Sequence, residues 1–171
     1  MHLIHTTFEE NILNILKDGY LRSSSQTKNV KMFGQEQGSK YIYLRLNKKN
    51  DYGNFILDED LLLKNNFYLK TGWSGEAFTT QDKIYKGDTL SKLKLKILLK
   101  KFNTKINNYF KLKKKEKFPI PILMSNEILL TKKIPLKKYL IQINISKYDK
   151  DICSYVEKNY PHTKIFYPDQ K

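Results

Sequence analysis

The start of the chain carries polar residues at a position where a ligand could be bound. His5, Thr6 and Thr7 follow directly on an apolar pair, so the sequence predicts a short strand over residues 2–6 with polar side chains at its carboxyl end. Imidazole and hydroxyl groups can hydrogen-bond a ribose or an amide, which makes this strand end a candidate binding site. The alternative is structural. Thr7 would then cap the following helix, with Glu10 completing a capping box, and His5 would hydrogen-bond within the core.

Several other chemistries lack the sequence patterns that they need. The chain has three histidines and a single cysteine, Cys153, without an HExxH motif or a Cys/His cluster, so no metal site is predicted. Cys153 is interpreted as a small buried side chain rather than a reactive thiol. No nucleophile elbow supports Ser/His/Asp hydrolysis. The Gly-Ser-Lys at 38–40 is not part of a complete P-loop, and glycine-rich dinucleotide fingerprints are absent.

Positive charge is the strongest compositional signal. The 32 lysines and arginines outnumber 17 acidic residues, which gives a formal net charge of +15. Such a field attracts polyanions, so nucleic acid is the expected partner. A merely solvated surface is the alternative, and a membrane surface is the least favoured. The candidate phosphate contacts lie on a predicted lysine-rich amphipathic helix and in the lysine run that follows it: Lys100, Lys101, Lys105, Lys113, Lys114 and Lys115.

The elements that would position these residues follow from the hydrophobic pattern. Strands are predicted over 2–6, 41–46, 55–57, 66–69, 127–130, 140–144 and 164–166. A capped helix is predicted between Thr7 and Gly19, a long amphipathic helix over 89–110 and a short helix over 151–159. Residues 71–75, which include the only tryptophan, are predicted to form a turn.

The chain is expected to form one domain. Its 171 residues suffice to bury a core, 40% of them are apolar, and neither a repeat nor a linker divides them. The predicted fold class is α+β, a single domain over 1–171 with a basic helical insertion at about 89–117. No stretch approaches the roughly 18 apolar residues that a membrane span needs, and the first residues are too polar for a signal peptide. A soluble protein of the cytoplasm or nucleus is expected, and the oligomeric state stays open.

Three segments, in this order, resemble parts of ADP-ribosyltransferase-like domains of the PARP/DarT type, which use NAD. The first, residues 3–21, has a strand ending in His-Thr-Thr, then a helix and an Asp-Gly-Tyr-Leu turn. The second, residues 38–44, is similar to the family's tyrosine-bearing element. The third, residues 126–130, is similar to the strand start that carries the family's catalytic glutamate. The resemblance is closest to the DNA-directed DarT-like branch, which pairs that glutamate with an arginine, whereas RNA 2′-phosphotransferases are similar at the first segment only.

The resemblance implies a fold and a set of residue roles. The fold would consist of split antiparallel β-sheets with flanking helices and a lysine-rich insertion. Glu127 would be the catalytic carboxylate near the NAD ribose, and Arg45 a second catalytic residue, since a guanidinium binds charged oxygens through paired donors. Arg45 is expected on the same strand face as Tyr41 and Tyr43, one of which would stack on nicotinamide. The remaining cofactor contacts would be His5, Thr6, Thr7 and Arg22.

The function that the resemblance implies is ADP-ribosyl transfer, with NAD as co-substrate, to nucleic acid or to a macromolecule bound to it. A carboxylate suits this reaction because breaking the nicotinamide–ribose bond builds positive charge on the ribose. The structural alternatives are a surface acid at a strand edge for Glu127 and ordinary strand positions for both tyrosines. The functional alternatives are a catalytically inactive basic module that binds nucleic acid, an RNA 2′-phosphotransferase-like enzyme, and an effector that ADP-ribosylates a protein.

Overall fold

The computed structural model describes residues 1–27, 40–46, 53–73, 83–115 and 124–167, with side chains described throughout except at 71–73, 105–115 and 124–126. The strands are β1 His2–His5, β2 Tyr20–Leu21, β3 Ile42–Leu46, β4 Phe55–Asp58, β5 Asn66–Trp73, β6 Ile84–Lys86, β7 Met124–Leu130, β8 Ile134–Pro135, β9 Leu140–Asn144 and β10 Lys164–Phe166. The α-helices are α1 Ile12–Asp18, α2 Lys92–Lys115, α3 Leu136–Tyr139 and α4 Lys150–Asn159. The short 3-10 helices are η1 Glu9–Asn11, η2 Ser24–Gln26, η3 Glu59–Lys64 and η4 Gly87–Thr89.

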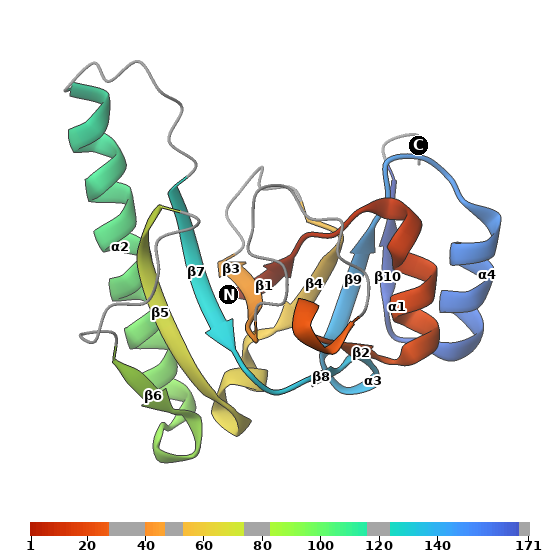
Figure 1. Ribbon diagram of the computed structural model, residues 1–171, viewed down its shortest axis with the longest axis horizontal. Coiled ribbons are helices and arrows are strands. Elements are labelled where there is room, and N and C mark those ends of the chain that lie inside the picture. The colour runs from red at the N-terminus through yellow and green to blue at the C-terminus, as the bar shows by residue number, and fades with distance from the viewer. Residues whose placement is uncertain (28–39, 47–52, 74–82, 116–123, 168–171) are drawn as a thin grey trace.

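Two sheets form the centre of the molecule (Figure 1). The larger sheet has eight strands in the order β10-β9-β4-β1-β3-β7-β5-β6, and the smaller sheet pairs β2 with β8. The described strand pairs are antiparallel, except that β10 runs parallel to β9. Antiparallel strands with helices segregated around them confirm the predicted α+β class.

Alternation of side chains along β3 separates two faces of the large sheet. On β3, Ile42, Leu44 and Leu46 are buried, whereas Tyr43 and Arg45 between them are half-buried. Successive residues of a strand point to opposite faces, so the aliphatic set and the polar set lie on different sides. We call the side of Leu44 the core face and the side of Arg45 the polar face.

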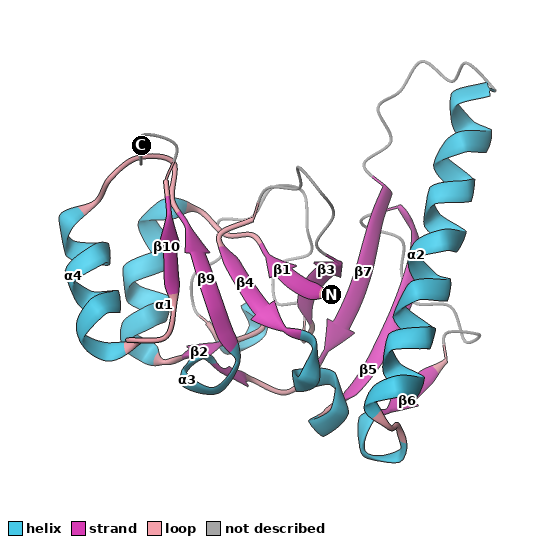
Figure 2. Cartoon of the chain, turned by 180° about the vertical axis from the view of Figure 1, so that it is seen from behind, coloured by secondary structure: helices cyan, strands magenta, loops and turns pink. Residues whose placement is uncertain are grey.

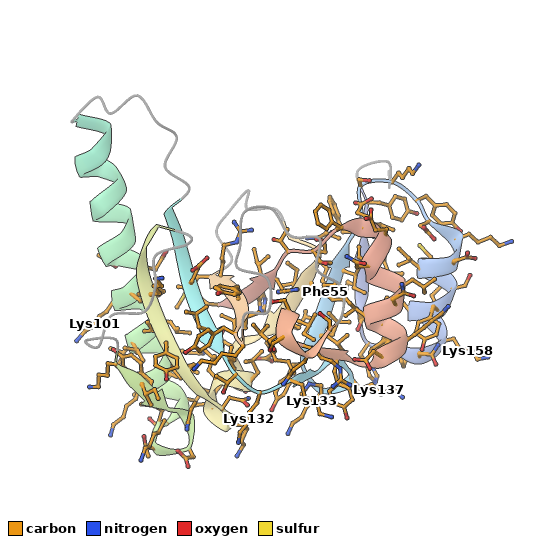
Figure 3. The ribbon with its side chains drawn as sticks, viewed as in Figure 1. Phe55, Lys101, Lys132, Lys133, Lys137 and Lys158 are labelled. Carbon is orange, nitrogen blue, oxygen red and sulfur yellow. The ribbon has the colours of Figure 1, made fainter. Side chains whose placement is uncertain are left out.

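Helices cover the core face at both ends of the sheet. α1 and α4 lie together beside β9 and β10, and α2 lies along β5 at the other end (Figures 1 and 2). Ile12 of α1, Val156 of α4 and Leu99 of α2 belong to one continuous cluster of buried apolar side chains, together with strand residues such as Leu44. Phe55, near the middle of the sheet, is among the largest fully buried side chains (Figure 3). The described helices and strands therefore share one core.

The first helix begins differently from the prediction. η1 precedes α1, and neither helix has a side-chain hydrogen bond at its N-cap. Thr7 donates its backbone N–H to Asn54 Oδ1 at 2.9 Å, and the N-cap of η1 is Phe8 rather than Thr7. The predicted Thr7 cap and its capping box with Glu10 are therefore wrong. Gly19 ends α1 with a φ of 76°, which confirms the predicted stop because this left-handed conformation favours glycine.

Two further boundaries differ from the sequence pattern. β5 continues to Trp73 because its backbone stays paired with β7 as far as Met124, so the predicted turn over 71–75 is wrong for residues 71–73. Residues 74–75 lie outside the described residues. α4 begins one residue earlier than predicted, because the Asp149 carboxylate accepts the first free N–H groups of the helix. The long helix α2 confirms the predicted lysine-rich block.

Candidate functional site

Three charged side chains form a row across the polar face of the large sheet. Arg45 on β3 is directly opposite Glu127 on β7, and Glu127 is directly opposite Lys70 on β5. Directly opposite residues on one face of a sheet have Cβ atoms about 5 Å apart. Glu127 is 4% exposed and Lys70 is 9% exposed, so Glu127 is not the surface acid that the structural alternative expected. Because the row is largely removed from water, the attraction of both cations for the carboxylate is strengthened.

A second row, two residues along the strands, is aromatic and apolar. Tyr43 on β3 and Tyr68 on β5 both lie opposite Leu129 of β7. Leu129 is fully buried, whereas both tyrosines are half-buried. Tyr41 meets the Tyr68 ring edge-on, with ring centroids 5.9 Å apart. Aromatic rings beside a guanidinium suit a flat, electron-poor ligand.

The charged row reaches the end of β1 through Arg45. The Arg45 guanidinium donates from Nη2 to Thr6 Oγ1 at 3.0 Å. The described pairing between β1 and β3 stops at Ile4 and Arg45, and beyond it His5 Nδ1 lies 3.0 Å from the carbonyl oxygen of Tyr43. The structure thus places Thr6 beside Arg45, two predicted residues, near Tyr43 on the polar face. The His5 side chain lies on the other face: His5 is directly opposite Phe55, and the two ring centroids are 6.3 Å apart.

His5 offers a hydrogen-bond acceptor at this strand end. Burial lowers the pKa of His5; the hydrogen bond to the Tyr43 carbonyl works against this shift, and the Arg45 guanidinium lowers the pKa further. The ring is therefore neutral at pH 7. Because a carbonyl oxygen only accepts hydrogen bonds, Nδ1 carries the proton and Nε2 keeps its lone pair. Nε2 can accept a hydrogen bond from a hydroxyl or an N–H.

The path of the chain after β1 is fixed by Asn54, which is fully buried. Asn54 Oδ1 accepts the Thr7 N–H at 2.9 Å, and the Asn54 carbonyl accepts the Asn144 N–H at 2.9 Å. The segment that follows β1 is thereby tied to β4 and β9. Thr6, the residue before this attachment, accepts from Arg45 through its hydroxyl, whereas Thr7 contributes its backbone amide to the attachment.

Arg22, the other predicted arginine, has its described contacts elsewhere. Its guanidinium donates to the Asp18 carboxylate from Nε at 2.7 Å and from Nη2 at 3.0 Å. This hydrogen bonding lowers the pKa of Asp18 and raises that of Arg22. The guanidinium also lies 5.3 Å from the centroid of the Tyr20 ring on β2. None of these contacts is with the residues around Arg45.

The predicted lysine contacts lie on α2, and only part of them is described. Lys100 and Lys101 are exposed. Lys105 and 113–115 have their backbone in α2, and their side chains lie outside the described part of the chain. Lys96 is also exposed, five residues before Lys101, which corresponds to about 140° around the helix axis. The exposed lysines of α2 therefore point in several directions.

Sequence reasoning missed two residues of the site, Lys70 and Asn54. Alternation along β5 places Lys70 on the same face as Tyr68, but only the pairing with β7 shows that it lies beside Glu127. Asn54 stands in a Gly-Asn pair ahead of a strand, a position typical of turns. Its burial depends on partners from distant segments, which no local pattern reveals.

The assembled groups have the chemistry of a nucleotide site. On the polar face, a carboxylate can bind ribose hydroxyls, a guanidinium can bind phosphate oxygens, and aromatic rings can stack on a base. Within residues 1–27, 40–46, 53–73, 83–115 and 124–167, no group of three or more His, Cys, Asp or Glu is arranged to hold a metal ion. Over the same described ranges, none of the helices is both long and apolar enough to span a bilayer.

Comparison with known proteins gives two matches. The model of a family of unknown function, DUF5846, matches residues 1–109. The uncharacterized protein L54 of Acanthamoeba polyphaga mimivirus is 32% identical over 178 residues, covering 96% of this chain and 88% of the relative. No solved structure matches. The family match includes β1, β3 and the residues from His5 to Lys70, but it ends before Glu127.

Proposed function

This chain belongs to DUF5846, a family of unknown function, and we propose that it is an NAD-dependent ADP-ribosyltransferase acting on nucleic acid. The observation that carries the proposal is the pairing of Arg45 with Glu127 on neighbouring strands of one sheet face. The resemblance assigns a glutamate and an arginine to such a site, although these two residues lie far apart in the sequence. The resemblance rests on three separate segments of the sequence. Their strands β1, β3 and β7 are neighbours in the sheet.

The residues present fit NAD as a co-substrate. Bound NAD would supply the ADP-ribosyl group. Glu127 would accept a hydrogen bond from a ribose hydroxyl, and its negative charge would stabilise the positive charge that develops as the glycosidic bond breaks. The electron pair of that bond leaves with nicotinamide, and the acceptor forms the new bond and loses a proton.

The neighbouring residues would orient the ribose and the leaving group. Tyr43 would offer a ring face to the nicotinamide. His5 would act indirectly, since its Nδ1 hydrogen-bonds the Tyr43 carbonyl from the core side. Arg45 is already held by Thr6, so its guanidinium is oriented before a ligand arrives. Such preorganisation lowers the cost of binding charged oxygens. Lys100 and Lys101 on α2 are proposed contacts for the phosphates of the acceptor.

A second candidate function follows if the row of Arg45, Glu127 and Lys70 only stabilises the fold. A buried carboxylate between two cations satisfies its charge without any ligand. On that reading the chain is a basic module that binds nucleic acid and leaves NAD intact. Its binding would be salt-sensitive, and a Glu127→Gln variant would bind as well as the wild type.

The experiment that tests the proposal follows label from the adenylate half of NAD. Purified protein is incubated with labelled NAD and with DNA, RNA or cell lysate, beside Glu127→Gln. We expect label on a macromolecule with the wild type only, and loss of the labelled product after DNase or RNase treatment. A labelled product that survives both nucleases would indicate a protein acceptor. A folded wild type that labels nothing and releases no nicotinamide would contradict the proposal, and 2′-phosphorylated RNA would then be the substrate to test.

A further inference from the structure

Two cations share one aromatic ring at the margin of the small sheet. Lys133 Nζ lies 4.1 Å and the Arg22 guanidinium carbon 5.3 Å from the centroid of the Tyr20 ring. The antiparallel pairing of β2 with β8 places these cations there. Leu21 is directly opposite Ile134, Arg22 follows Leu21, and Lys133 precedes Ile134. Like charges brought together in this way repel each other.

Further lysines extend this positive surface. Lys132 and Lys137 are exposed and flank β8, and the backbone N–H of Leu136 donates to the Gly19 carbonyl at 2.9 Å, which holds α3 beside the end of α1. Lys132, Lys133 and Lys137 lie along one edge of the molecule (Figure 3). We call these three lysines with Tyr20 and Arg22 the Tyr20 patch.

Little negative charge opposes the Tyr20 patch. The stretch from Ile128 to Tyr148 contains no Asp or Glu. Asp18 is the carboxylate at the patch, and it is already hydrogen-bonded to Arg22. Lys133 also lowers the pKa of Asp18, although less than Arg22 does. One carboxylate among four cations leaves a net positive surface.

We propose that the Tyr20 patch binds the phosphate backbone of nucleic acid. An anion placed between the cations would relieve their repulsion, and phosphates bind lysine and arginine through charge-assisted hydrogen bonds. The Tyr20 ring is occupied by Lys133 and Arg22, so it supports the cations rather than stacking on a base. The patch therefore contributes affinity without sequence preference.

The position of the patch relates it to the proposed active site. β7 carries Glu127 and ends at Leu130, directly before the turn that contains Lys132 and Lys133. Lys132 is five residues after Glu127, a separation of at most about 17 Å along extended chain, so the lysines lie within a few nucleotide lengths of the carboxylate. A nucleic-acid strand held by the Tyr20 patch would pass close to Glu127. The choice of nucleic acid as partner rests on the proposed function.

The test compares two variants with equal loss of charge. The patch variant combines Lys132→Gln, Lys133→Gln and Lys137→Gln. The control variant combines Lys94→Gln, Lys147→Gln and Lys150→Gln, which are exposed lysines on other parts of the chain. Binding of fluorescent single-stranded DNA and RNA oligonucleotides is measured by anisotropy, without NAD, at several salt concentrations. The result therefore does not depend on catalysis.

We expect the patch variant to bind about tenfold more weakly than the control variant at physiological salt. The slope of log K against log salt should fall by about 2, because each lost phosphate contact on a single strand contributes about 0.7. A variant with three Lys→Arg changes at the same positions should bind like the wild type. An equal loss of oligonucleotide affinity in both Gln variants would overturn the proposal, because the overall positive charge of the protein would then explain binding. Loss of binding to phosphatidylserine vesicles with unchanged oligonucleotide binding would also overturn it.

Discussion

At the scale of single residues, the site depends on the two cations beside Glu127. Glu127→Gln removes a carboxylate between Arg45 and Lys70, so we expect the free energy of unfolding to fall by about 3 kcal/mol. Adding Lys70→Gln returns the net charge of the row to its wild-type value of +1 and should recover about half of this loss. The measurement is urea unfolding of both variants and the wild type.

Activity separates a catalytic role of Glu127 from a purely structural one. The Glu127→Gln, Lys70→Gln variant should regain stability without regaining NAD turnover. If turnover returns together with stability, Glu127 acts only as a counter-ion in the sheet. A double variant as unstable as Glu127→Gln alone would contradict the charged row itself.

His5 predicts a pH dependence of stability. The pKa of His5 in the folded chain is lowered from 6.5, chiefly by burial. As the pH falls below about 6.5, the unfolded chain binds a proton that the folded chain does not, so stability decreases by at most about 1.4 kcal/mol per pH unit. His5→Asn keeps a donor for the Tyr43 carbonyl but cannot be protonated in this range. It should lose less stability than the wild type between pH 7.5 and 5.5.

A matched control for this effect is His162, which is exposed. His162→Asn should retain the pH dependence of the wild type. The outcome that would contradict the buried, neutral His5 is the same loss of stability on acidification in His5→Asn and in the wild type.

The residue types of the site could be predicted from the sequence better than their arrangement in space. Tyr43 and Arg45 were expected on one face because they are two positions apart in a strand, and the structure confirms this. The neighbourhood of Arg45 and Glu127 could be proposed only from the resemblance, since pairing between distant strands leaves no local pattern. Lys70 was missed for the same reason.

At the scale of elements, the exit from β1 positions the site. Asn54→Leu would leave the Thr7 N–H without its acceptor inside the protein, at a cost of about 1–3 kcal/mol. Asn54→Asp keeps an acceptor for that N–H. If the segment directs Thr6 to Arg45, Asn54→Leu should raise the KM for NAD several-fold, and Asn54→Asp should recover most of this loss. Equal KM values in the wild type and Asn54→Leu would contradict a positioning role.

β3 could be predicted because one of its faces is buried, and alternation records that burial in the sequence. β4 is buried on both faces, and it could be predicted from its continuous apolar run. Thr7 shows where the local reasoning failed. Its side chain suits a helix cap, but its backbone N–H is bound by the buried Asn54 amide, and η1 begins only at Glu9. A tertiary contact thus outweighed a local preference, as the wrong turn at Trp73 also illustrates, where pairing with β7 extends β5.

At the scale of the whole molecule, the sheet separates the core from the site. α1, α2 and α4 contribute to one apolar cluster with the core face, which leaves the polar face for Arg45 and Glu127. The α+β class follows from the order of strand and helix patterns along the chain. The order of strands in the sheet, and with it the Tyr20 patch, depends on pairings such as β2 with β8 that no local pattern encodes.

The most direct test of the central claim is the rate at which the purified protein releases nicotinamide from NAD. The wild type is compared with Glu127→Gln and with Glu157→Gln, an exposed carboxylate on α4 that serves as the matched control. We predict release by the wild type and by Glu157→Gln. In folded Glu127→Gln the rate should be lower by a factor of about 100 or more, because the charge that stabilises the transition state is gone. Unchanged release in Glu127→Gln, or no release by folded wild type with an acceptor present, would contradict the assignment of this site to ADP-ribosyl transfer.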